Sequence, residues 1–314
     1  MSDHLETLLN PDVIRRSAEI AERFARREPF RHVVIEDFFS ADYAHRLLAD
    51  FPSFERGNAR NEAGELGNKS TVERVRDLST AYRDLDELIK SSGFLDLIGN
   101  LTGVDKLLYD PFYFGGGTHE NREGQDLDPH VDFNRHPIEN WHRRLNLIVY
   151  LNPEWDDAWG GSLELHSDPR ARDNRIKLVN PLFNRAVIFE TTESSWHGFR
   201  RIELPEDRKN LSRRSIALYF YTQDRPAEEL ADPHSTIYVD RALPAHFVAG
   251  KTLADVDVEE LRTLLHRRDQ HNQRLYRDIT HLTAQLEQAQ SMLYAGNLGR
   301  LRYLAKIVRE RLRR

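Results

Sequence analysis

A short stretch, DPHVDFN at residues 128–134, contains two side chains that can hold a metal ion. In an extended segment successive side chains alternate between faces, so His130 and Asp132 point the same way while Val131 points into the opposite layer. Two ligands of one metal fit this spacing. Taken alone, H-x-D is a common triplet, and a hydrogen-bonded surface pair is its simplest interpretation.

A third ligand is available in SSWHGFR, where His197 starts a β-rich run 67 residues after His130. About four short strands lie between the two histidines, and in a two-layer barrel such an interval brings a late strand back beside an early one. Two histidines and one carboxylate leave three positions open on an iron ion. This facial triad suits non-haem Fe(II) and O₂ chemistry.

The run RRSIALYFYT adds a cation to the predicted site. Arg213 stands 16 residues after His197, and Ser215 lies on the same strand face, whereas Arg214 faces the other way. A guanidinium matches a carboxylate with two parallel hydrogen bonds and is always charged. Arg213 is therefore the expected anchor for the distal carboxylate of a 2-oxo acid.

Four motifs, taken in order, resemble the prolyl 4-hydroxylase-type branch of the Fe(II)/2-oxoglutarate-dependent oxygenases. They are H-x-D, RRLNLIVYLNPEWDDAWGGSLELH, FNRAVIFETTESSWHGF and the R-x-S of the last strand. The resemblance covers roughly residues 105–222, and VVIEDFFSADYAHRLL before it is also similar to the family. It implies that His130, Asp132 and His197 ligate iron and that Arg213 binds the C5 carboxylate of 2-oxoglutarate.

The same resemblance implies further contacts to 2-oxoglutarate. Ser215 is the small hydroxylic partner two residues after Arg213, and Tyr150 sits where relatives often place a tyrosine that supports the same carboxylate. A barrel-lining aromatic is an equally good interpretation of Tyr150. Tyr113 is a weaker candidate for the same role. Many prolyl hydroxylases use lysine as the anchor, so Arg213 loosens the link to collagen-type enzymes.

The function implied by the resemblance is hydroxylation of an unactivated C–H bond in peptidyl proline or a small molecule, with release of succinate and CO₂. Fe²⁺, 2-oxoglutarate and O₂ take part, with ascorbate as an added reductant. Asp132 favours hydroxylation, because relatives that halogenate lack this carboxylate. A non-catalytic cupin-like binding module is the alternative, although it would have no reason to keep Arg213.

Composition limits the other possibilities. The chain has 314 residues, with 39% hydrophobic and 31% charged, enough for a folded core. It has no cysteine, so disulfides, thiolate nucleophiles and cysteine-bound metals are excluded. No run of about 18 apolar residues forms a transmembrane segment, and MSDHLETLLN has no signal-peptide core. A cytoplasmic location is expected.

The texture of the sequence predicts a mainly β core, a double-stranded β-helix (jelly roll, cupin-like), flanked by N-terminal helices and followed by a C-terminal helical extension. About eight short β-rich runs follow Leu107, whereas Gly- and Asn-rich residues 56–70 are expected to form a loop. The expected divisions are an N-terminal flank (1–104), an oxygenase core (105–225), a connecting segment (226–254) and the extension (255–314).

The extension carries apolar residues with 3-4 spacing, interrupted by Arg268 and Asn272, as in a coiled-coil seam or a long helix. Gly296 and Gly299 interrupt this pattern. Residues 298–314 hold six arginines and Lys306 against Glu310, a net charge of +6. Because the whole chain has a net charge of −6, the other residues together carry −12. This basic helix is expected to pack as an intrachain hairpin or to form a homodimer arm. Anchoring to an anionic membrane or to RNA is the alternative.

Other polar residues are less informative. Residues 115–129 are expected to form a mobile lid over the iron, or a loop without a role. Some polar residues near the triad are candidates for a substrate mouth, or for solvated loops: Arg122, Asn134, Arg135, Trp141 and Arg143. The histidines without a partner at ligand spacing are expected on the polar surface: His119, His136, His142 and His166.

Overall fold

A computed structural model of the chain describes residues 3–26, 28–60, 66–241, 243–244 and 246–294. Contacts divide it into two compact units, Met1–Ala242 and Leu243–Arg314. The domain bounds expected from the sequence stay a prediction. Within the described residues, no helix combines the length and the apolar character that crossing a bilayer requires.

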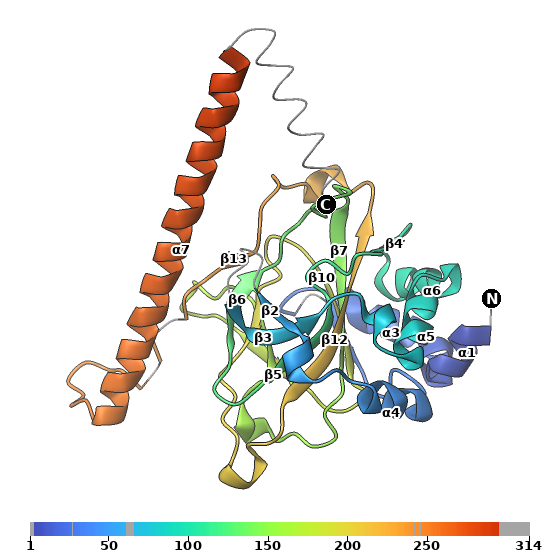
Figure 1. Cartoon of the computed structure of the whole chain (residues 1–314). Helices are drawn as coiled ribbons and strands as arrows, with labels where there is room; N and C mark the ends of the chain where they lie inside the picture. The colour runs from blue at the N-terminus through green and yellow to red at the C-terminus, as the bar shows by residue number, and fades with distance from the viewer. Residues whose placement is uncertain (1–2, 27, 61–65, 242, 245, 295–314) are drawn as a thin grey trace. The chain divides into compact units, whose positions relative to one another are not determined.

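The first unit is built around two antiparallel sheets that face each other (Figure 1). The larger sheet has the order β1-β10-β7-β12-β5-β3-β2, with β4 paired to β12, and the smaller has the order β13-β6-β11-β8-β9. The larger sheet comprises β1 (His32–Ile35), β2 (Asn58–Arg60), β3 (Leu66–Val72), β4 (Leu108–Tyr109), β5 (Gly117–Asn121), β7 (His142–Tyr150), β10 (Ala186–Glu190) and β12 (Arg213–Thr222). The smaller comprises β6 (Leu127–Val131), β8 (Leu163–His166), β9 (Ile176–Val179), β11 (His197–Phe199) and β13 (Ile237–Tyr238).

From β5 to β12 the chain winds repeatedly between the two sheets, which is the connectivity of a double-stranded β-helix. The predicted jelly-roll core is confirmed. The central strands β7 and β12 explain why it is stable, because both of their faces are buried. Leu145 and Leu147 pack in a core on the outer face of the sheet, whereas Ile148 and Tyr150 pack in a core between the sheets.

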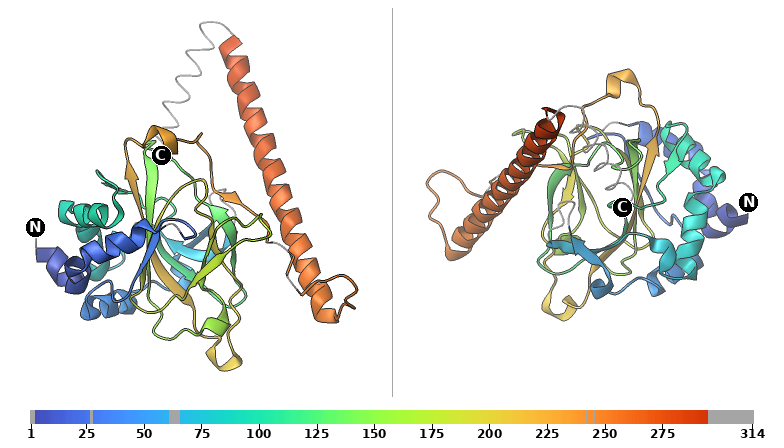
Figure 2. Two further views of the ribbon diagram at one scale, coloured as in Figure 1. Left: turned by 180° about the vertical axis from the view of Figure 1, so that it is seen from behind. Right: turned by 45° about the horizontal axis from the view of Figure 1, so that its top comes forward.

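The outer face of the larger sheet is covered by the N-terminal helices (Figure 2). Each helix turns its apolar face toward the sheet. Phe24, Leu85 and Ile98 are fully buried there, in one cluster with Leu147 of β7. The helices are α1 (Asp3–Leu8), α2 (Pro11–Arg15), α3 (Ser17–Ala25), α4 (Ala41–Ala49), α5 (Thr80–Ile89) and α6 (Ser92–Thr102), and short 3-10 turns lie at Phe54–Arg56, Val75–Asp77, Asp157–Trp159, Glu206–Arg208 and Ala227–Glu229.

Two segments that the sequence predicts as loops contain strands, so both predictions are wrong. Within residues 56–70, β2 and most of β3 extend the larger sheet. Within residues 115–129, β5 pairs with Arg213–Ala217 of β12 and β6 enters the smaller sheet, so the segment is not a lid. In both cases pairing with a distant strand supplies backbone hydrogen bonds that local Gly and Asn content does not reveal. The expected connection 226–254 likewise contributes β13, which pairs with β6.

The second unit contains α7, a single helix of 40 residues at Asp255–Tyr294. Its first turn is held by Asp257, whose carboxylate accepts the Ala254 N–H at 2.9 Å and lies 2.7 Å from the Lys251 ammonium. The basic segment 298–314 lies outside the described residues.

Candidate active site

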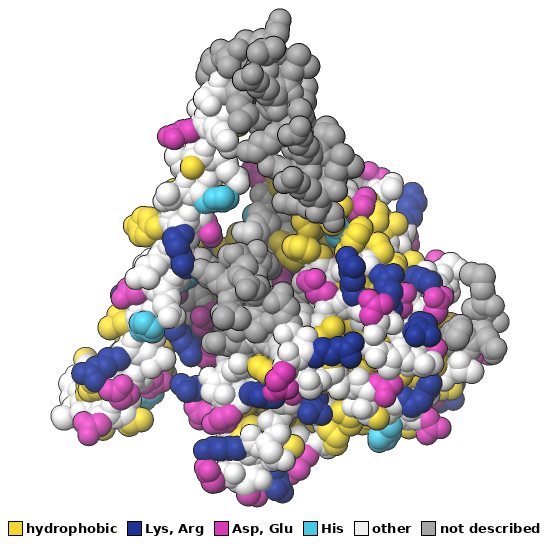
Figure 3. Space-filling view, viewed as in Figure 1, with side chains coloured by type: hydrophobic (Ala, Val, Ile, Leu, Met, Phe, Trp, Pro, Cys, Tyr) yellow, Lys and Arg dark blue, Asp and Glu magenta, His cyan; other side chains and the backbone are white. Residues whose placement is uncertain are grey.

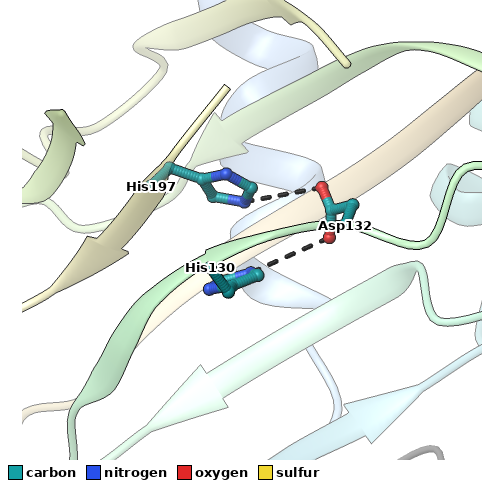
Figure 4. A group of neighbouring side chains, drawn as sticks. All are labelled: His130, Asp132 and His197. Atoms are coloured by element: carbon teal, nitrogen blue, oxygen red, sulfur yellow. Dashed lines mark ion pairs between the residues drawn. The ribbon is translucent and has the colours of Figure 1, made fainter. Parts of the chain in front are cut away.

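Three side chains that can ligate a metal ion, His130, Asp132 and His197, lie together where β6 pairs with β11 (Figure 4). His197, the first residue of β11, lies directly opposite His130 of β6 in the antiparallel register, and their ring centroids are 4.2 Å apart. Asp132 follows the end of β6. Its Oδ1 is 3.7 Å from His130 Nε2 and its Oδ2 is 3.5 Å from His197 Nε2. All three side chains are buried.

The histidines are oriented as metal ligands. Nδ1 of His130 donates to the Asp128 carbonyl at 2.9 Å, and Nδ1 of His197 donates to the Ser195 carbonyl at 2.9 Å. Each ring therefore presents an unprotonated Nε2 toward Asp132. Burial lowers the pKa of both rings, that of His130 to about 3 with a contribution from His197, so both are neutral at ordinary pH.

The spacing of the three donors fits one cation. Contacts of 3.5 and 3.7 Å are too long for good hydrogen bonds. Donors that each lie about 2 Å from one metal ion, at right angles, lie about 3 Å apart. Two neutral imidazoles and a carboxylate on one side of an ion are the facial triad of non-haem iron sites, which leaves the opposite positions for other ligands.

A second layer of contacts holds Asp132. Asn146 Nδ2 donates to Asp132 Oδ2 at 2.7 Å, and Arg143 Nη2 lies 3.1 Å from the same oxygen. Arg143 also donates to Asn146 Oδ1 through Nε at 3.0 Å and Nη2 at 2.8 Å. Burial opposes ionisation of Asp132, but the positive charge of Arg143 and the hydrogen bond from Asn146 hold its pKa well below the usual range. Asp132 is therefore a carboxylate, as a metal ligand must be.

From the sequence, Arg143 is a candidate for a substrate mouth or for a solvated loop, and both interpretations are wrong. The residue is fully buried, and its guanidinium lies 3.6 Å from the Tyr219 ring centroid and 4.3 Å from that of Phe133. A buried guanidinium stacked on two rings and bonded to a carboxylate fixes the carboxylate, and it is not available to incoming molecules.

Arg213 provides a buried positive charge on the inner face of β12. Its Nε donates to the Gly161 carbonyl at 2.6 Å, and Nη2 donates to the Tyr150 hydroxyl at 3.1 Å. Its guanidinium lies 4.3 Å from the ring centroid of Phe199, two residues after His197 on β11. Two residues along a strand span about 7 Å, so Phe199, and with it Arg213, lies close to His197 of the triad.

The charge of Arg213 is not balanced within the part of the chain that the structure describes. No carboxylate there lies within ion-pair distance, and burial lowers the pKa of Arg213 although Tyr150 raises it. Ser215 lies opposite Tyr150 in the strand register and faces the same way. A buried guanidinium without an acidic partner, flanked by two hydroxyls, suits the carboxylate of a bound anion.

Gly161 is required beside Arg213. Its φ of +70° lies in the region that favours glycine, and a Cβ there would be 2.9 Å from the Trp155 ring and 3.3 Å from Arg213 Cδ. A side chain would displace the carbonyl that receives the Arg213 Nε.

The comparisons with known proteins agree with this geometry. Residues 116–221 match the sequence profile of the 2OG-Fe(II) oxygenase superfamily. Over these residues the chain is similar to the 2OG-Fe(II) oxygenases. The resemblance identified in the sequence is thereby confirmed, and the cofactors of the family are Fe²⁺ and 2-oxoglutarate.

Relatives of the oxygenase domain include prolyl hydroxylases. Mouse prolyl 3-hydroxylase OGFOD1 is 26% identical over 236 residues, which is 70% of this chain and 40% of that protein. The chain thus spans about two fifths of the length of this curated relative. Two solved structures are also similar: a Trichoplax adhaerens prolyl hydroxylase in complex with a hypoxia-inducible-factor peptide (16% identity, TM-score 0.49, 67% of this chain and 91% of that chain) and Phytophthora capsici prolyl 4-hydroxylase (20% identity, TM-score 0.47, 82% and 75%).

Tyr113 does not lie with Arg213, Tyr150 and Ser215 in the candidate site. Its hydroxyl donates to Asp86 of α5 at 2.9 Å, and its ring packs in the core formed with the N-terminal helices. The predicted role for Tyr113 as a cofactor contact is wrong, because helix docking on the outer face of the sheet takes this side chain.

Several polar residues were assigned to the surface wrongly. His136 is buried with Nε2 3.2 Å from Asp110 Oδ1, and His166 is buried between Glu164 and Asn174. His142 is also buried. Asn134, expected at the mouth or in a solvated loop, is buried and bonds the backbone at Asp232 and His234.

Three further residues lie near the candidate site. The sequence analysis does not single out Asn121 and Tyr238, and His119, which it expects on the polar surface, is half-buried. Asn121 and His119 of β5 lie opposite Arg213 and Ser215 in the register, so they share the inner face of the larger sheet. Tyr238 of β13 lies opposite His130, with the two ring centroids 5.2 Å apart. These side chains reach the site because their strands pair with strands that are distant in the sequence. No local sequence pattern predicts that pairing.

Proposed function

We propose that this chain is an Fe(II)- and 2-oxoglutarate-dependent dioxygenase that hydroxylates an unactivated C–H bond and releases succinate and CO₂. One observation carries the proposal. A buried His130, Asp132 and His197 cluster lies beside a buried Arg213 that has no acidic partner among the described residues. A metal site and an anion site next to each other are what a chelating 2-oxo acid needs.

The roles of the side chains follow from their contacts. His130, His197 and Asp132 would hold the iron, and Arg213 would receive the C5 carboxylate of 2-oxoglutarate. Tyr150 accepts a hydrogen bond from Arg213, so its own O–H is free to donate to that carboxylate. Ser215 would add a second hydroxyl from the same sheet face. Asn146 and Arg143 keep Asp132 ionised and oriented.

When bound, iron supplies the redox chemistry that couples decarboxylation of 2-oxoglutarate to transfer of one oxygen atom from O₂ into the substrate. The protein contributes placement of both partners and exclusion of water from a buried site. Asp132 occupies the ligand position that halogenating relatives leave open, which supports hydroxylation. Ascorbate as an added reductant is part of the proposal.

Peptidyl proline is the first substrate class to examine, because the curated relative is a prolyl 3-hydroxylase. A small molecule is the second. Tyr238, whose ring centroid lies 5.2 Å from that of His130, is a candidate for contact with the substrate beside the proposed metal ligands. A cytoplasmic location for the reaction stays a prediction.

Iron-dependent succinate release tests the proposal. Protein loaded anaerobically with Fe(II) is mixed with 2-oxoglutarate, O₂, ascorbate and either proline-containing peptides or a metabolite extract. Succinate should form only with iron, and mass spectrometry should find a substrate that has gained one oxygen atom. A cupin-like binding module would bind ligand without making succinate, and that result would refute the enzymatic proposal.

A homodimer through the C-terminal helices is also proposed. Anchoring of residues 298–314 to a membrane or RNA concerns residues outside the described ranges and stays a prediction. Retention on lipid vesicles or RNA that does not change when residues 296–314 are removed would exclude it.

A further inference from the structure

α7 carries a heptad seam along one side. Taking Val258 as position a, apolar residues recur at a and d through Leu293, over five heptads, except at Arg268 and Asn272. The a residues are Val258, Leu265, Asn272, Ile279, Leu286 and Leu293, and the d residues are Leu261, Arg268, Leu275, Leu282 and Ala289. A seven-residue repeat that keeps the same register over this length is the pattern of a supercoiled helix pair.

The opposite side of α7 is polar. In the heptads from Val258 on, the b, c and f positions hold Glu, Gln, Arg, His, Thr and Ser, with Ala284 and the last helical residue, Tyr294, as the exceptions. The seam residues Leu265, Leu275, Ile279, Leu282 and Leu286 are 46% to 62% exposed. Figure 3 shows separate hydrophobic side chains along α7 among charged ones. An apolar stripe limited to the a and d positions is wide enough to pack against one partner helix. A helix that packs on a globular core has a wider apolar face.

We propose that a second copy of this chain covers the seam, forming a parallel two-stranded coiled coil of α7 in register. Three features argue for self-pairing. In register, every apolar a and d residue meets its own copy. The g-to-e′ pairs contain no like charges, and Asp257 meets Arg262 of the other copy. A single Asn at an a position, here Asn272, is a known determinant of register and of the dimeric state.

Arg268 fits the same arrangement. Its long side chain can leave the seam at d while its stem stays apolar, and Asp269 of the other copy occupies the neighbouring e position. An antiparallel pairing centred on residues 268 and 272 would instead bring two copies of Asp269 together at e and leave Leu286 and Leu293 unpaired. The parallel dimer therefore satisfies more of the seam. It is independent of the catalytic proposal.

Sedimentation equilibrium of the full chain tests the dimer without any activity readout. The mass should be twice 36.7 kDa. Ile279→Asp with Leu282→Asp places two charges in the seam and should weaken association at least about a hundred-fold. Thr280→Asp with Ala284→Asp adds the same charge on the polar side and should change association less than about three-fold.

The orientation is tested by cross-linking. Because the chain has no cysteine, Ile279→Cys introduces a single thiol. Oxidation should give a covalent dimer with Ile279→Cys, since a–a′ pairs lie within disulfide reach only in a parallel dimer, and none with Thr280→Cys. A wild-type monomer at all concentrations, or a seam variant that stays dimeric, would overturn the proposal. A dimer that cross-links through 280 and not through 279 would overturn the register.

Discussion

Asn146 donates a 2.7 Å hydrogen bond from Nδ2 to Oδ2 of Asp132, and this contact joins the larger sheet to the metal-type cluster of the smaller one. Asn146 lies on β7 and Asp132 follows β6, so the bond crosses the interior of the jelly roll. It links the stability of the barrel to the position of a proposed iron ligand.

Asn146→Ala should lower iron affinity by about ten- to a hundred-fold, the range seen when support of a metal ligand is lost. The measurement is competition for Fe(II) against a coloured chelator under anaerobic conditions, so that the result does not depend on turnover. The exposed Asn100 offers a control, and Asn100→Ala should bind iron as the wild type does. Equal affinity in Asn146→Ala would show that the contact does not position Asp132.

Asp132→Ala and His130→Ala should each abolish 2-oxoglutarate turnover, a loss of at least about a hundred-fold, because one ligand of three is removed. Iron-dependent succinate release is the assay. Asp173→Ala, at an exposed loop, should retain full activity. Full activity in Asp132→Ala would contradict the triad.

Arg213→Ala should raise the KM for 2-oxoglutarate at least about ten-fold, because a charged hydrogen-bond partner of its carboxylate contributes about 1.5–3 kcal/mol. Tyr150→Phe should raise the same KM less, since the guanidinium stays. Initial rates at varied 2-oxoglutarate separate KM from kcat. A lowered kcat at unchanged KM in both variants would argue against the carboxylate site.

Glu164 should make the protein sensitive to acid. It is buried, and although burial opposes ionisation, His166 and Arg241 lower its pKa to about 2. A depressed folded-state pKa contributes stability above the ordinary value of 4.5, and that contribution is lost as the pH falls toward 2. The contribution is on the order of 3 kcal/mol. Urea unfolding between about pH 7 and pH 3 should show a shallower pH dependence in Glu164→Gln, and an unchanged slope would refute this role.

Leu147→Ala should lower the free energy of unfolding by about 2–5 kcal/mol, because it opens a cavity in the core beneath the helices. Urea denaturation gives the value. Leu178→Ala removes the same atoms from a side chain that is 61% exposed and should change stability by about 0.5 kcal/mol or less. Similar losses in both variants would contradict the burial pattern.

The sequence predicted the proposed metal ligands and Arg213 better than it predicted the side chains that surround them. His130, Asp132 and His197 could be grouped because side-chain chemistry and the two-residue period of a strand are local properties, and Arg213 and Ser215 followed for the same reason. Asn146 could not be found, because its contact depends on which strands face each other across the barrel.

Docking of the helices was equally hidden. Tyr113 stood at a suitable distance along the sequence from the triad, yet its hydroxyl bonds Asp86 of α5. Arg143 carries a charge that usually indicates the surface, and only its pairing with Asp132 makes its burial possible. In each case the decisive partner is far away in the sequence, so no window of local pattern contains it.

A crystal structure of the protein with Mn(II), a redox-stable substitute for ferrous iron, and 2-oxoglutarate tests the central claim most directly. One manganese ion should lie about 2.0–2.2 Å from Nε2 of His130, Nε2 of His197 and an oxygen of Asp132. The far carboxylate of 2-oxoglutarate should lie on Arg213. A metal ion bound elsewhere would contradict the triad, and 2-oxoglutarate bound away from Arg213 would contradict the carboxylate site.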